Sequence, residues 1–313
     1  MSRVAAIFPG QGSQKVGMGE DVAGRWPAAA EVFADIDDGL GVDLSGLCWS
    51  GPADDLKLTT NTQPALLTHS VAAWEVLSRA GLEVEAVAGH SLGEYSAIVA
   101  AGGLGRVDAA RTVRERGRLM QAAVPVGEGA MAAIIGLDDE VVTGACGDVA
   151  AELGEPVVAV NFNSPGQVVI AGTARAVEKA AAACQEAGAR RALPLPVSAP
   201  FHSPLMAPAR EGLEPVLRDL VFNDLAVPVY RNVDAEPVRS AAEVRAGLIR
   251  QVDAPVLWTQ TVQRMVADGF DTFVEIGTGK VLSGLVKRID RSATCYQAGT
   301  VAGIENVISE LVT

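Results

Sequence analysis

Short apolar runs alternate with longer segments of helical periodicity along most of the chain. The runs Val4–Phe8 and Thr272–Ile276 are typical of buried strands, whereas the apolar residues of Thr60–Ala80 recur at the spacing of one helix face. The same pattern predicts helices at Arg106–Val124, Leu205–Leu220, Ala241–Gln251 and Thr259–Asp268, and a further strand at Val227–Asn232. Strands that alternate with helices in this way predict an α/β protein.

The pattern changes at Gly129, where the predicted elements become shorter. Strand, helix, strand, strand, helix and strand follow one another at Ala130–Ile135, Asp138–Glu152, Val157–Phe162, Val168–Ala171, Thr173–Ala187 and Arg191–Val197. The order βαββαβ is that of the ferredoxin-like unit. We therefore expect residues 128–197 to form a small ferredoxin-like subdomain, inserted into a large α/β-hydrolase-like domain made of residues 1–127 and 198–313.

A serine between two glycines follows the apolar run that ends at Gly89. The segment Gly89-His90-Ser91-Leu92-Gly93 is preceded by strand-like residues and followed at once by helix formers, the context of a nucleophile elbow. Glycine is required on either side because the strand turns sharply into the helix. These five letters can also arise by chance, but their context favours Ser91 as a nucleophile.

One arginine of the predicted helix at Arg106–Val124 shares a stripe with apolar residues. Arg116 lies in phase with Val113 and Met120, whereas Arg111, Arg114 and Arg118 form a separate and solvated stripe. Burying a guanidinium without an anion beside it costs on the order of several kcal/mol, the desolvation penalty of an ion. Arg116 therefore either forms an internal ion pair with Asp or Glu, or binds a carboxylate of the substrate.

The predicted insertion is followed by a proline-bounded loop, Ser198–Pro204, that contains His202. A chain that leaves and rejoins the large domain at neighbouring points brings this loop close to Ser91. A histidine within reach of a serine hydroxyl can act as its general base, although a lone loop histidine can also be structural.

Composition narrows the possible partners. The chain has 313 residues, 49% of them hydrophobic, and a formal net charge of −13, which disfavours nucleic acid as a partner. Its four cysteines have neither metal-ligand nor disulfide spacing, so we expect a reducing, cytoplasmic setting and no bound metal. Met1–Phe8 is too short for a signal peptide, and we expect no association with a membrane.

Six segments occur in the order typical of the malonyl-CoA:acyl carrier protein transacylase family, which this chain resembles over essentially its whole length: Gly10–Gln14, Gly89–Glu94, the helix around Arg116, Asn161–Gln167, Pro200–Ser203 and Gln251–Val256. The resemblance implies that Ser91 is the nucleophile and His202 its base. It also implies that the backbone carbonyl of Gln251 orients the histidine.

The remaining implied roles concern the acyl group. The backbone amides of Gln11 and Leu92 would stabilise the oxyanion, and Arg116 would pair with the free malonyl carboxylate. Phe201 would limit the space around the acyl α-carbon and so favour malonyl over methylmalonyl groups.

By the same resemblance, malonyl-CoA is the substrate and no cofactor is bound. The malonyl group would pass through Ser91 to the phosphopantetheine thiol of an acyl carrier protein, by a ping-pong mechanism, for fatty-acid or polyketide synthesis. We expect a monomer.

Carrier proteins of this kind are generally acidic, so docking needs a local basic patch on this chain. The candidates are Arg190–Arg191 and the group Lys287, Arg288 and Arg291.

Two other functions remain open from the residues alone. An ordinary esterase or thioesterase usually has several strands before its elbow and an acidic third member of the triad, and neither is evident here. A catalytically silent acyl-binding domain would form no covalent acyl-enzyme.

Overall fold

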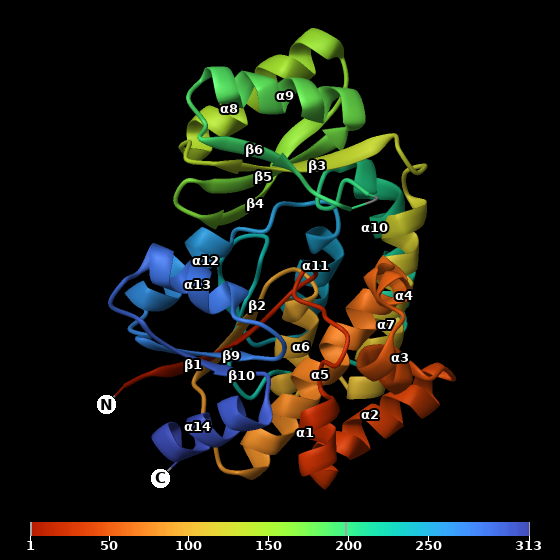
Figure 1. The fold of residues 1–313 in the computed structure, drawn as a ribbon, viewed down its shortest axis with the longest axis vertical. Helices are drawn as coiled ribbons and strands as arrows, with labels where there is room; N and C mark the ends of the chain where they lie inside the picture. Colours follow the sequence, from red (N-terminus) through yellow and green to blue (C-terminus); the bar gives the residue numbers. More distant parts are fainter. Residues whose placement is uncertain (1, 198, 313) are drawn as a thin grey trace.

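A computed structural model describes residues 2–197 and 199–312, which form two β-sheets flanked by helices (Figure 1). Ser198, the first residue of the predicted loop, lies outside the described residues. The larger sheet has the strand order β10-β9-β1-β2-β7-β8. Its strands are β1 (Val4–Phe8), β2 (Ala86–Gly89), β7 (Val229–Tyr230), β8 (Pro237–Val238), β9 (Thr272–Ile276) and β10 (Thr294–Ala298).

Neighbouring strands of the larger sheet are parallel except for the antiparallel pair β7 and β8. Both faces are covered by helices, as a parallel sheet requires. Ala5 and Ile7 of β1 pack with α12 (Trp258–Ala267) and α13 (Val281–Ile289). Ala6 and Phe8 point to the opposite face and join the main core. The predicted α/β class is confirmed.

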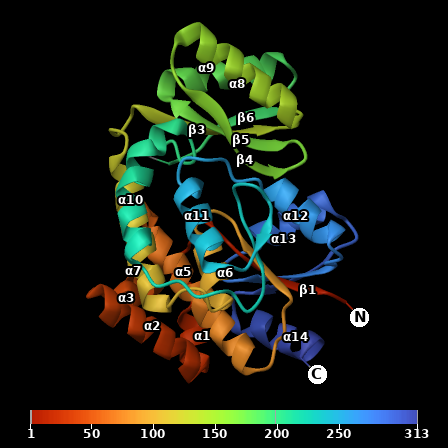
Figure 2. The ribbon, with the colours of Figure 1, turned by 180° about the vertical axis from the view of Figure 1, so that it is seen from behind.

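Helices fill most of the chain between β1 and β2. They are α1 (Glu20–Arg25), α2 (Pro27–Leu40), α3 (Leu44–Ser50), α4 (Ala53–Lys57) and the long α5 (Thr59–Arg79). The helices that follow β2 are α6 (Gly93–Ala100) and α7 (Arg106–Ala122), and later in the chain come η1 (Pro204–Met206), α10 (Ala207–Asp219), α11 (Ala241–Gln251) and α14 (Val301–Leu311). From behind, α10 is seen to pack along α7 (Figure 2).

The smaller sheet is antiparallel and has the order β4-β5-β3-β6. Its strands are β3 (Gly129–Ile135), β4 (Val157–Ser164), β5 (Gln167–Thr173) and β6 (Arg191–Pro194), and its helices are α8 (Asp139–Leu153) and α9 (Ala174–Glu186). The chain thus follows the predicted order βαββαβ. Both helices cover the face of this sheet that points away from the rest of the protein (Figure 1).

Hydrogen bonds join β4 to the segment that follows α11. The amide of Phe162 donates to the carbonyl of Val256 at 3.0 Å, and the amide of Val256 donates to the carbonyl of Val160 at 2.8 Å. The Thr259 hydroxyl also donates to the carbonyl of Phe162, at 2.9 Å. This seam fixes the smaller sheet against the larger part of the protein.

Two predicted strands are shorter than expected. The strand predicted at Val227–Asn232 is confined to Val229–Tyr230, because the chain then turns and buries the side chain of Asn232. The strand predicted at Arg191–Val197 ends at Pro194. The amide of Leu195 still donates to the carbonyl of Met131 at 2.9 Å, but Pro196 then has no amide hydrogen to continue the ladder. No helix in the described parts of the chain is both long and apolar enough to cross a membrane.

Candidate active site

Ser91 lies at the sharp turn between β2 and α6. Its φ of 51° is in the left-handed region, which is strained for a residue other than glycine. A Cβ atom added to Gly89 would lie 2.0 Å from the carbonyl oxygen of Gly93, and one added to Gly93 would lie 2.0 Å from that of Phe8. Only glycine therefore fits on either side of the serine, which is the geometry of a nucleophile elbow.

His202 reaches Ser91 from the loop that precedes η1. Its Nε2 lies 2.8 Å from Ser91 Oγ, and its Nδ1 lies 2.9 Å from the backbone carbonyl oxygen of Gln251. A carbonyl only accepts hydrogen bonds, so Nδ1 carries the proton and Nε2 is free to accept one from the serine. Burial, with the nearby Arg116 cation, lowers the pKa of His202 to about 3, so the imidazole is neutral near pH 7.

Arg116 projects from α7 to the same point and is 1% exposed. Its Nη2 donates to Ser91 Oγ and to Gln251 Oε1, both at 3.0 Å, and its Nη1 donates to Gln63 Oε1 at 2.8 Å. No carboxylate of residues 2–197 and 199–312 forms an ion pair with it. Within the described residues Arg116 therefore has no internal ion pair, and its guanidinium faces Ser91.

A small pocket opens beside these groups, with a volume of about 110 Å³. The smaller sheet and the helices and loops of the larger part of the protein both line it. Met131, Asn161 and Leu195 come from the smaller sheet and the chain next to it, whereas Met120 and Phe201 line it from the larger part of the protein. The polar lining of the pocket consists of Ser91, Arg116, the imidazoles of His90 and His202, and the side-chain amides of Gln11, Gln63 and Asn161. The pocket therefore suits a short acyl group that carries one charge.

Gln11 and Leu92 lie on the two loops that flank this pocket. Gln11 follows β1 and lines the pocket, and Leu92 directly follows the nucleophile at the start of α6. No acceptor within the described chain takes a hydrogen bond from either backbone amide. Two unpaired amides near a nucleophile are the donors that an oxyanion requires.

Sequence reasoning missed three polar residues of the site. The Ser91 amide donates to Asn232 Oδ1 at 2.6 Å, Gln63 holds one arm of Arg116, and Glu94 lies buried behind the elbow. A signal existed for Asn232, a polar residue that ends an apolar strand pattern. Among the described residues, no group of three histidine, cysteine or acidic side chains is placed to hold a metal ion.

Comparison with known proteins gives a consistent result. The sequence profile of the acyl transferase domain matches residues 6–307. The malonyl CoA-acyl carrier protein transacylase of Haemophilus influenzae is 51% identical over 314 residues, which cover 100% of both chains. That of Bacillus subtilis is 47% identical, over 99% of this chain and 98% of its own.

Solved structures agree with the sequence relatives. The acyl carrier protein S-malonyltransferase of Vibrio cholerae superposes with a TM-score of 0.95 at 50% identity, covering 98% of this chain and 100% of its own. A malonyl-transacylase in complex with a type II PKS acyl-carrier protein superposes with a TM-score of 0.96 at 48% identity, covering 98% of this chain and 99% of its own.

The buried imidazole leads to a prediction about pH and stability. The pKa of His202 is about 3 in the folded protein and 6.5 when the side chain is free, so between these values the unfolded chain binds the extra proton. Its contribution to stability is present above pH 6.5 and falls by about 1.4 kcal/mol per pH unit below it. Asparagine tolerates the positive φ of this position, so His202→Asn should fold. The variant should lack the contribution of one proton, about 1.4 kcal/mol per pH unit, to the pH dependence of the free energy of unfolding.

Urea unfolding of both proteins between pH 5 and 7.5 measures the difference between the two slopes. The comparison is needed because other buried groups also contribute: burial lowers the pKa of His69 and raises that of Glu94, with opposite effects on the slope. Equal slopes for the two proteins would show that His202 is not a buried neutral imidazole.

Proposed function

This chain belongs to the acyl transferase family, and on that basis we propose that it transfers the malonyl group of malonyl-CoA to the phosphopantetheine thiol of an acyl carrier protein. The observation that carries the proposal is the pairing of an activated serine with a buried, unpaired cation. Ser91 Oγ lies within hydrogen-bond distance of both His202 and Arg116. A malonyl thioester has a carbonyl that Ser91 can attack and a free carboxylate that Arg116 can bind.

In the first half-reaction, His202 Nε2 accepts the proton of Ser91 Oγ as the oxygen attacks the thioester carbonyl. The 2.9 Å contact from Nδ1 to the Gln251 carbonyl holds the ring in the required tautomer and stabilises the imidazolium that forms. The pair is a serine-histidine dyad supported by a backbone carbonyl. The amides of Gln11 and Leu92 donate to the developing oxyanion, and such donors contribute about 3 kcal/mol each.

The tetrahedral intermediate then collapses. The carbon–sulfur bond of malonyl-CoA breaks, His202 returns its proton to the departing thiolate, and malonyl remains on Ser91 as an ester. In the second half-reaction the thiol of the carrier protein loses its proton to His202 and attacks this ester. The serine leaves with the same proton, which restores the free enzyme and gives ping-pong kinetics.

The smaller sheet has a clear role in this scheme. We propose that residues 128–197 act as an inserted ferredoxin-like subdomain that covers the acyl pocket, while residues 1–127 and 198–313 carry the dyad and Arg116. The position of Met131 and Leu195 in the pocket wall supports this division.

The biological setting follows from the proposed reaction. The malonyl-loaded carrier protein supplies extender units to fatty-acid synthesis and, with a different carrier protein, to polyketide synthesis. We propose a cytoplasmic monomer. The four cysteines, all within the described residues, are free thiols, which supports a reducing compartment.

The geometry disfavours a hydrolase with a classical triad. In such an enzyme an acidic side chain would receive the hydrogen bond of His202 Nδ1. Here the acceptor is the backbone of Gln251, and the nearby cation favours an acyl group with its own carboxylate.

Mass spectrometry after incubation with malonyl-CoA is the direct test of the proposed reaction. The protein should gain the mass of one malonyl group, and Ser91→Ala should abolish the gain because no other residue takes the acyl group. A silent acyl-binding domain would show no covalent adduct. An adduct that survives in Ser91→Ala would place the nucleophile elsewhere.

Arg116→Ala should slow malonyl transfer more than acetyl transfer. The loss should correspond to about 2–3 kcal/mol for malonyl, the usual cost of removing a charged hydrogen-bond partner. Acetyl-CoA has no carboxylate to lose. The ratio of the two kcat/KM values measures the effect, and Arg114→Ala on the same helix is the matched control. Equal losses for both acyl groups would make Arg116 purely structural.

Phe201 should select malonyl over methylmalonyl. Its ring lines the acyl pocket, where one extra methyl group is worth about 1–3 kcal/mol, or roughly 10–200-fold. Competition between the two thioesters should therefore favour malonyl, and Phe201→Ala should narrow the preference. The wild-type protein would contradict this assignment if it transferred both groups at equal rates.

We propose that the carrier protein docks on a basic depression lined by Arg190, Arg191 and Arg288. No ion pair joins these three arginines to a carboxylate in the part of the chain that the structure describes, although the net charge is −13. Unpaired cations on an acidic protein suit an acidic partner. Of the other predicted cations, Lys287 and Arg291 do not line this depression.

Replacing all three arginines with Glu should raise the KM for the carrier protein about tenfold or more, since about 0.5 kcal/mol for each of three surface charges already corresponds to tenfold. The KM for malonyl-CoA reports on the other half-reaction and allows the two effects to be separated. The matched control is Arg111→Glu with Arg118→Glu, on the exposed stripe of α7. If the control variant raises the KM for the carrier protein instead, docking occurs elsewhere.

A further inference from the structure

A buried cluster of polar side chains lies directly behind the elbow. Glu94 of α6, Asn232 after β7 and Gln251 at the end of α11 are each 1% exposed or less. The reaction described above uses only the backbone of Gln251 and neither of the other two residues. Buried polar groups are costly unless they are fully hydrogen-bonded, so their arrangement calls for a reason.

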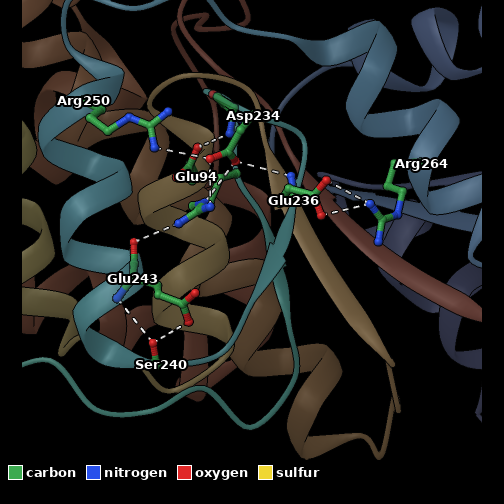
Figure 3. Close-up of polar contacts among 9 residues, drawn as sticks. Glu94, Asp234, Glu236, Ser240, Glu243, Arg250 and Arg264 are labelled. Carbon is green, nitrogen blue, oxygen red and sulfur yellow. Dashed lines mark hydrogen bonds and ion pairs between the residues drawn. The ribbon is translucent and has the colours of Figure 1, made fainter.

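One oxygen of the Glu94 carboxylate holds the cluster together. Glu94 Oε2 accepts a hydrogen bond from the backbone amide of Asn232 at 2.8 Å and another from Gln251 Nε2 at 3.0 Å. Figure 3 shows Glu94 beside Asp234, on the loop that follows β7. The carboxylate thus fixes two segments that are far apart in the sequence.

Those two segments in turn hold the backbone of the elbow. Asn232 Oδ1 accepts from the amide of Ser91 at 2.6 Å, and Asn232 Nδ2 donates to the carbonyl of Gly89 at 2.7 Å. Gln251 Nε2 donates to the carbonyl of Ser91 at 3.0 Å. These bonds satisfy the polar backbone groups of a residue whose φ of 51° is otherwise unfavourable.

The same amide also connects Glu94 to Arg116. Gln251 Oε1 accepts from Arg116 Nη2 at 3.0 Å, while Nε2 of the same side chain donates to Glu94. Cation, amide and carboxylate therefore form one hydrogen-bonded chain. A direct ion pair would neutralise Arg116, but an anion placed beyond an amide balances part of the charge and leaves the guanidinium open toward the pocket.

We propose that Glu94 is a positioning residue: acting through Asn232 and Gln251, it fixes the Ser91 elbow and serves as the buried counter-charge of Arg116. The part of this inference that concerns transfer rates rests on the proposed function. The part that concerns Arg116 does not, because it can be measured on the folded protein alone.

Other charged groups around Glu94 are already paired. Arg231 faces it from the loop after β7 but binds Asp234 at 2.7 Å, and Arg250 of α11 reaches the same Asp234 at 3.3 Å. Burial raises the pKa of Glu94 to about 7, which its hydrogen bonds and Arg231 oppose. Arg116 is therefore the buried cation that an ionised Glu94 balances through the amide.

The first test is a double-mutant cycle on stability. Glu94→Gln keeps the size of the side chain and removes its charge, and Arg116→Met removes the cation. We expect the double variant to lose less free energy of unfolding than the sum of the two single variants, because removing both leaves no isolated buried charge. Urea unfolding at pH 8, where Glu94 is largely ionised, measures the difference.

Glu275→Gln is the matched control. Glu275 is also buried, but on β9, where it accepts hydrogen bonds from the amides of Leu282 and Ser283 at the start of α13. Its substitution should be additive with Arg116→Met. If the losses of free energy of unfolding in Glu94→Gln and Arg116→Met were also additive, Glu94 would not be the counter-charge of Arg116.

Should Glu94→Gln fail to fold, the pH dependence of stability in Arg116→Met decides the question. Loss of the cation should raise the pKa of Glu94 further and so steepen the fall in free energy of unfolding between pH 7 and pH 9. An unchanged pH dependence would overturn the role of Glu94 as counter-charge.

The second test is kinetic. Glu94→Gln should lower kcat about tenfold for both malonyl and acetyl transfer, because the Ser91 elbow serves both, and should leave the KM for acetyl-CoA within twofold. Glu275→Gln should leave kcat unchanged. An unchanged kcat in Glu94→Gln would overturn the positioning role. If the wild-type protein transfers no malonyl group, the proposed function fails while the stability cycle still decides the link to Arg116.

Discussion

The site depends on a buried guanidinium, that of Arg116, beside which residues 2–197 and 199–312 place no carboxylate in direct contact. Desolvating a cation is costly, and α7 places Arg116 where its hydrogen-bond acceptors among the described residues are amide oxygens and one hydroxyl. Its guanidinium also lies 5.7 Å from the centre of the Tyr95 ring. That cost is acceptable only if the surrounding groups are held firmly enough to solvate the cation in place of water. The side-chain amides of Gln63 and Gln251 do so, and they leave one side of the cation facing Ser91.

The same requirement explains why Gln251 occupies its position. Its backbone carbonyl orients His202, and its side chain bridges Arg116 to the elbow. One residue thus sets the relative positions of His202, Arg116 and Ser91. An acid in its place would neutralise the cation, and a shorter side chain would leave the carbonyl of Ser91 without its donor.

The sequence predicted those features that depend on local pattern. The glycines around Ser91 mark a turn that only glycine allows, and the helical phase of Arg116 alone predicts that it lies among apolar neighbours. The roles of Asn232 and Glu94 could not be predicted in this way, because their partners lie far away in the sequence and only the fold brings them together; for Asn232 the pattern marks only a polar residue at the end of a strand. The early end of the strand at Tyr230 has the same cause, since Asn232 must leave the sheet to reach the elbow.

The seam between β4 and Val256 has a consequence for how this architecture can change. Val256, which bonds to β4, follows only a few residues after Gln251. The strand that lines the pocket and the carbonyl that binds His202 are therefore held in place together. Replacing the smaller sheet with that of a relative, to admit bulkier acyl chains, would displace His202 unless residues 157–164 and 252–259 were replaced together. Substitution of single side chains in the pocket wall is therefore an easier way to change substrate choice than replacement of the whole smaller sheet with its helices.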